Sequence, residues 1–241
     1  MTTIILALGP VFIIAFYIYF RDKYEKEPWT ILLLAMLAGC FITLPILPIE
    51  LLFSKVGESF GGLWNAAWNS FFVAALCEEG FKFLALVLLV WKNKEFNEKF
   101  DGIVYATFIS LGFAGVENLL YVLKTGVSTG IVRAITAVPA HAIFGITMGF
   151  FFGIAKFYPK KRKRYLHYSF LLPFFLHGCY DFILMSELNY LFFFFVPFVV
   201  YLWISGLKKM KKLNETSFFR NDLDIGIDFS KVKDFGDKPS N

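Results

Sequence analysis

The sequence LCEEGFKF, residues 76–83, lies inside an apolar run that extends from residue 63 to residue 91. A charged side chain at the centre of a bilayer costs roughly 3 to 10 kcal/mol or more. Packing alone does not account for two adjacent carboxylates, Glu78 and Glu79, in such a run. The run therefore predicts a membrane-spanning helix that carries a polar site.

The composition of the whole chain supports a membrane protein. Of its 241 residues, 57% are hydrophobic and 18% are charged, and the mean hydropathy is +0.60. Soluble domains have fewer apolar and more charged residues. The net charge of +5 comes from short basic blocks between apolar runs, which favours a role in membrane topology, and we expect no nucleic-acid partner.

Seven apolar runs are long enough to cross the hydrocarbon core: 3–20, 29–53, 63–91, 101–123, 134–155, 165–186 and 190–207. The first, third and fifth connections and the segment 208–212 together hold sixteen Lys and Arg residues. The other connections hold three: Lys55, Lys124 and Arg133. The positive-inside rule then places the N-terminus outside and the C-terminus in the cytoplasm. The predicted fold class is an all-α polytopic membrane helix bundle with about seven transmembrane helices.

The predicted domain organisation is simple. Residues 1–207 form a single transmembrane domain. Residues 208–241 carry mixed charge and are not apolar enough to span, so we expect a cytoplasmic tail that is partly disordered.

The spacing of ionisable residues predicts contacts within two helices. Lys82 lies four residues after Glu78 and three after Glu79, so it shares a helical face with both carboxylates. His177 and Asp181 are also four apart. A carboxylate one turn from a histidine can fix the histidine tautomer and raise its basicity.

Two further runs contribute ionisable residues. Glu117 follows Phe113 by one turn in the run 101–123. His141 begins a series with Gly145, Gly149 and Gly153, whose spacing of four predicts a helix-packing seam with the histidine at its outer end.

The charges in these runs do not balance. Glu78, Glu79, Glu117 and Asp181 face one cation, Lys82, so either some carboxylates are protonated or a bound cation neutralises them. A zinc ion held by His141, His177 and Glu117 would serve, with a second glutamate as general base on its water. A metal-free scheme with a glutamate–histidine pair uses the same residues, and the sequence leaves both open.

In their order along the chain, these residues resemble the motifs of the PrsW family of intramembrane proteases. Glu78-Glu79-x-x-Lys82 is similar to the EExxK motif, and Phe113-x-x-x-Glu117 to FxxxE. His141-x-x-x-Gly145 and His177-x-x-x-Asp181 are similar to HxxxG and HxxxD. The segment 24–28, YEKEP, also resembles the first loop of the family.

The resemblance implies an enzyme that hydrolyses peptide bonds in a bacterial plasma membrane. It implies Glu78, Glu79 and His177 as the catalytic residues, supported by Lys82, Glu117, His141 and Asp181. The implied partner is a single-pass membrane protein, an anti-sigma factor cut first on the extracytoplasmic side during stress signalling. The cofactor is unknown, and zinc is the candidate.

Two alternatives come from other classes of protein. Intramembrane carboxylates and histidines also form the proton relays of proton- or cation-coupled transporters, although many transporters have two repeated halves and the glutamate pair occurs once here. A non-catalytic scaffold of the same fold would be favoured by substituted motif residues, and all motif residues are present.

Overall fold

The computed structural model describes residues 2–219 and contains helices but no strand in that part of the chain. The helices are α1 (Thr2–Arg21), α2 (Trp29–Gly57), α3 (Gly62–Ala67), α4 (Leu76–Val90), α5 (Lys99–Thr125), α6 (Val127–Ile135), α7 (Ala137–Phe157), α8 (Arg162–Met185) and α9 (Asn189–Glu215). A π-helical segment, η1 (Trp68–Ala75), joins α3 to α4, and a single 3₁₀ turn, η2 (Pro159–Lys161), precedes α8. The predicted all-α membrane bundle is confirmed.

Six helical segments of the described residues are long and apolar enough to cross a membrane. They correspond to six of the seven predicted spans. The remaining predicted span, 63–91, corresponds to residues 62–90 of the structure, which are helical throughout but divided into α3, η1 and α4. The predicted placement of the N-terminus outside remains a prediction.

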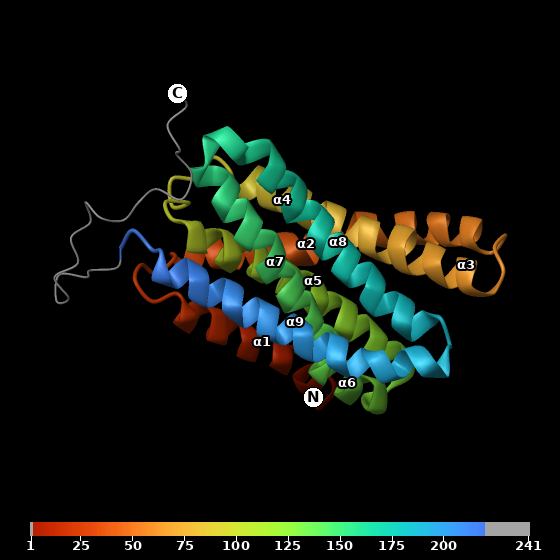
Figure 1. Cartoon of the computed structure of the whole chain (residues 1–241). Helices are drawn as coiled ribbons and strands as arrows, with labels where there is room; N and C mark the ends of the chain where they lie inside the picture. The colour runs from red at the N-terminus through yellow and green to blue at the C-terminus, as the bar shows by residue number, and fades with distance from the viewer. Residues whose placement is uncertain (1, 220–241) are drawn as a thin grey trace, which may run out of the picture.

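Helices α5 and α7 form the centre of the bundle (Figure 1), where they pack more extensively against each other than any other pair. Almost all residues of α7 and most of α5 are buried. The surrounding helices expose large apolar side chains, including Phe41, Leu51, Leu88 and Phe193. A bundle of this kind buries its polar groups at the centre and presents apolar side chains to lipid.

The close approach of α5 and α7 depends on small residues. A Cβ atom at Gly149 would lie 2.1 Å from the Gly102 carbonyl oxygen, and one at Gly153 would lie 2.1 Å from the Lys99 carbonyl oxygen. At Gly145 a Cβ would lie 2.9 Å from the Thr107 Cα. These glycines therefore allow the two backbones to touch, one to three turns from His141.

The structure adds two features that the apolar pattern does not predict. Residues 127–135 form the separate helix α6, because Gly126 at φ +91° ends α5 and a break at Thr136 precedes α7. The last helix, α9, continues past residue 207 to Glu215, and Asn214 Nδ2 donates to the Arg21 carbonyl oxygen at 2.9 Å. The predicted tail, residues 208–241, therefore begins as a helix, and its residues 220–241 lie outside the described residues.

The α5–α7 contact leads to a stability prediction. Gly149→Ala should destabilise the protein by about 1–3 kcal/mol, because the two backbones must separate to admit the methyl group. The measurement is thermal unfolding of the purified protein in detergent. Gly9→Ala is the matched control, because a Cβ there meets nothing within 4 Å. Equal unfolding temperatures for the two variants would contradict the prediction.

Candidate active site

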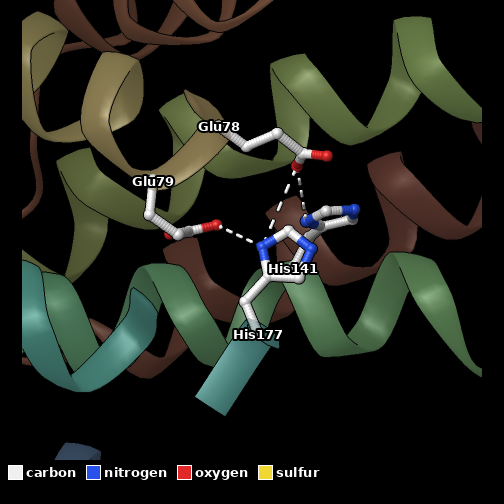
Figure 2. A group of neighbouring side chains, drawn as sticks. All are labelled: Glu78, Glu79, His141 and His177. Atoms are coloured by element: carbon white, nitrogen blue, oxygen red, sulfur yellow. Dashed lines mark hydrogen bonds and ion pairs between the residues drawn. The ribbon is translucent and has the colours of Figure 1, made fainter. Parts of the chain in front are cut away.

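Three helices bring together the residues of the candidate site. Glu78 and Glu79 lie on α4, His141 on α7 and His177 on α8. Each offers one nitrogen or oxygen atom, and these four atoms all lie within 4.8 Å of one another. Figure 2 shows the four side chains pointing toward a common centre.

The π-helical segment η1 lies directly before the glutamate pair. Its wider turns change the helical phase between α3 and α4, so the faces of the two helices are not continuous. Trp68, at its start, donates from Nε1 to the Phe53 carbonyl oxygen of α2 at 2.9 Å. Such segments occur frequently at functional sites, and this one sets which side of α4 faces the bundle centre.

The Lys82 ammonium connects the members of the group. It lies 3.0 Å from Glu78 Oε2, 2.8 Å from Glu79 Oε1 and 3.2 Å from His141 Nδ1. It also lies 4.1 Å from the centroid of the Phe113 ring. The side chain is fully buried, so its charge compensates the glutamates without competition from water.

Both histidines present Nδ1 inward and Nε2 toward an outer carboxylate. His141 Nε2 lies 2.9 Å from Glu117 Oε2, and His177 Nε2 lies 3.1 Å from Asp181 Oδ2. A carboxylate accepts only, so each Nε2 carries the proton. At His141, the inward Nδ1 then has a lone pair, which accepts from the Lys82 ammonium.

At His177 the inward contact needs a positive species. Nδ1 lies 3.0 Å from Glu79 Oε1, and a lone pair facing a carboxylate is repulsive unless a proton or a cation lies between the two atoms. Glu79 Oε2 is buried and has no hydrogen-bond partner among the described residues.

The donors fit a zinc ion by distance and by charge. Zinc bonds of about 2 Å in a tetrahedron place ligand atoms about 3–4 Å apart. The separations here are 3.0 Å for His177 Nδ1 to Glu79, 3.9 Å for His141 Nδ1 to Glu78 and 4.0 Å for His177 Nδ1 to Glu78. Since Glu117 is paired with Arg133, the carboxylates of Glu78, Glu79 and Asp181 against the ammonium of Lys82 leave two negative charges, which equal the charge of Zn²⁺ in magnitude.

Glu117 lies outside this group of four. Its Oε2 contacts His141 and forms an ion pair of 2.7 Å with Arg133 Nη2. Its predicted role as a metal ligand is untested, and in this geometry it orients His141 instead. Arg133 was missed as a site residue because it belongs to α6, which the hydropathy pattern assigns to a connection.

Phe144 was also missed. Its ring stacks on His177 with centroids 4.9 Å apart and an interplanar angle of 18°. It follows His141 by three residues on α7, so the helical spacing of the apolar residues around His141 is the signal that could have found it.

A cavity of about 540 Å³ reaches the group. Glu78, His141 and His177 line it, whereas Glu79 and Lys82 do not. Its lining extends to Lys124 and Arg133 and to Met185, at the ends of α5, α6 and α8. A substrate in this cavity would therefore contact Glu78 and the two histidines and not Glu79 or Lys82.

The chain is similar to known proteases over most of its length. The profile of the PrsW family, described as intramembrane metalloproteases, matches residues 27–204. Protease PrsW of Geobacillus kaustophilus is 42% identical over 81% of this chain and 85% of the relative. The proteins of that name from Clostridioides difficile and Bacillus subtilis are 39% and 37% identical, over 90% and 88% of this chain and 94% and 96% of the relatives.

No solved structure matches this chain. The matches nevertheless cover the candidate site and the helices that carry it. They confirm the resemblance to the PrsW family, and with the apolar helices they support a multi-pass bacterial membrane protein. This chain belongs to the PrsW family of intramembrane metalloproteases.

Proposed function

We propose that this protease makes the first cut in a single-pass membrane protein, an anti-sigma factor, on the extracytoplasmic side of the membrane. The observation that carries the proposal is the cavity that runs from Glu78, His141 and His177 to Lys124 and Arg133. In the predicted orientation, these two basic residues lie at the outer end of the bundle. Family membership favours a protease over the transporter alternative.

The lining of the cavity suits a segment at a membrane boundary. Apolar side chains such as Ile46, Leu47 and Val73 cover much of the wall. Lys124 and Arg133 lie at its outer part, where a peptide would leave the apolar region. A transmembrane helix followed by polar residues would match this lining, with its apolar part against the apolar wall and its polar part near Lys124 and Arg133.

The glutamates take different roles in this proposal. Glu78 lines the cavity and is the general base that takes a proton from the attacking water. Glu79 is fully buried behind it and positions His177 and Lys82. Lys82 compensates the negative charge of both glutamates.

The histidines and their outer carboxylates complete the scheme. His141 and His177 present Nδ1 to the reacting centre, and Glu117 and Asp181 hold the tautomer that makes this possible. A zinc ion bound by Glu79, His141 and His177 would replace the Lys82 ammonium at the lone pair of His141 Nδ1, and it would polarise the scissile carbonyl and lower the pKa of its water. Arg133 holds Glu117 in place from the outer side.

The first test is cleavage of a tagged single-pass anti-sigma factor co-expressed with this protein and followed by immunoblot. Glu78→Gln should lower cleavage by 100-fold or more, because the amide cannot accept the proton from water, and His177→Ala should abolish it. Glu58→Gln, an exposed change of the same type, is the control. Cleavage that survives Glu78→Gln and His177→Ala at equal membrane abundance would refute the assigned site.

A second prediction concerns the outer carboxylates. Asp181→Ala should lower kcat by about 10- to 100-fold, because His177 loses the partner that fixes its tautomer. Because Asp181 also lines the cavity, the diagnostic quantity is kcat and not KM. Steady-state cleavage of a peptide substrate by purified protein measures both, and unchanged kcat would remove Asp181 from the scheme.

Metal removal gives a third prediction. Purified protein should contain about one zinc per chain, and a chelator should remove both the zinc and the activity. Zinc content should fall in His141→Ala and His177→Ala and persist in Glu58→Gln. Full activity in protein shown by elemental analysis to be free of metal would instead support the glutamate–histidine route.

A further inference from the structure

A second group of carboxylates lies at the other end of α5. Glu25 and Glu27 belong to the connection between α1 and α2, and Asp101 lies in the first turn of α5. Each offers an oxygen, and the three oxygens lie within 4.8 Å of one another. Glu27 is 2% exposed and Asp101 is 0% exposed, so this is not an acidic surface patch.

Each carboxylate has one oxygen held by a protein donor. Asp101 Oδ2 accepts from the backbone N–H groups of Asn97 and Glu98, at 2.9 and 2.8 Å. Glu25 Oε1 accepts from Asn97 Nδ2 at 3.1 Å, and Glu27 Oε2 accepts from the Tyr105 hydroxyl. The three side chains are therefore oriented before any ligand binds.

The second oxygen of each carboxylate has no partner. Glu25 Oε2, Glu27 Oε1 and Asp101 Oδ1 are buried and accept no hydrogen bond from another protein group within the described residues, and Glu27 and Asp101 are close enough to share a proton when no cation is bound. A buried carboxylate oxygen without a partner is costly, and three of them in one group are typical of a site whose ligand supplies positive charge.

The surroundings add negative charge. Asp22 is 0% exposed with both oxygens unpaired, and Glu98 is 1% exposed. Burial raises the pKa of Asp22 to about 7 and that of Glu27 to about 8, so near neutral pH both carboxylates need a nearby cation to stay fully charged. The positive charges of Lys26 and Lys99 lower the pKa of Asp22 and Glu98, respectively, but within residues 2–219 neither lysine forms an ion pair with these carboxylates. The Lys26 ammonium donates instead to the carbonyl oxygens of Tyr19 and Asp22.

We propose that Glu25, Glu27 and Asp101 bind a divalent cation of the Mg²⁺ or Ca²⁺ class. All donors are oxygens, which these hard cations prefer and which zinc sites rarely use alone. Ca²⁺ is bound by carboxylate oxygens with water in the remaining positions, and Mg²⁺ keeps several waters beside its carboxylate ligands. The group contains no histidine or cysteine, unlike the candidate active site.

The cation would join two parts of the chain, and a hydrogen bond brings a third part to the same end of the bundle. It would hold the connection between α1 and α2 against the start of α5, and Glu98 at the α5 N-cap accepts from Ser217, just after α9. In the predicted orientation this end faces the cytoplasm. The site is therefore structural and lies apart from the chemistry of the proposed function.

The test uses terbium luminescence, because Tb³⁺ replaces Ca²⁺ at oxygen sites and Tyr105 lies next to Glu27. Purified wild-type protein should show saturable emission when tyrosine is excited, and Mg²⁺ or Ca²⁺ should displace it. Glu27→Gln/Asp101→Asn should abolish this emission. Glu78→Gln/Glu79→Gln should keep it, which separates this site from the candidate active site.

A milder variant keeps the proposal testable if the double variant does not fold. Glu25 is only half-buried, and Glu25→Gln should weaken cation affinity about tenfold in protein that elutes as a single species. The thermal unfolding temperature should also rise when Mg²⁺ or Ca²⁺ is added to wild type, and it should rise much less in Glu25→Gln. No sensitised emission in wild type, or emission lost only in Glu78→Gln/Glu79→Gln, would overturn the proposal.

Discussion

The candidate site depends on the contacts of the buried Lys82 ammonium. It contacts both glutamates of α4 and His141 of α7, and it faces the Phe113 ring of α5. Removing one partner of a buried ion pair costs about 3–5 kcal/mol, since the other charge stays uncompensated. The glutamates can therefore lie at the bundle centre only while three helices hold this lysine among them.

Each histidine next to this lysine and the glutamates is paired on its other side with a carboxylate, His141 with Glu117 and His177 with Asp181. Glu117 and Asp181 take the Nε2 side, which leaves Nδ1 of both rings facing the glutamates. The π-helical segment before α4 and the stacking of Phe144 on His177 set the directions from which these groups meet. Charge, tautomer and helix phase thus act together, and each would be ineffective without the other two.

Contacts within one helix could be predicted from the sequence, whereas contacts between helices could not. A spacing of three or four residues was enough for Glu78–Lys82 and His177–Asp181, which the structure contains. The pair Arg133–Glu117 depends on the short helix α6, and the approach of Glu27 to Asp101 depends on a loop folding onto α5. Hydropathy also misses the π-helical segment, because an apolar run has the same composition in either kind of helix.

The two carboxylate groups follow one physical rule but differ in chemistry. Both hold buried oxygens in place with donors and leave some of them without a partner. One group mixes nitrogen and oxygen donors, and the other has oxygen only, so they favour different cations. Asp101 and Glu117, the residue that orients His141, are sixteen residues apart on α5, about 24 Å along a helix, so the two groups lie at different ends of the bundle. The central helix α5 therefore contributes the carboxylate that orients His141 near one end and Asp101 of the proposed cation group at the other.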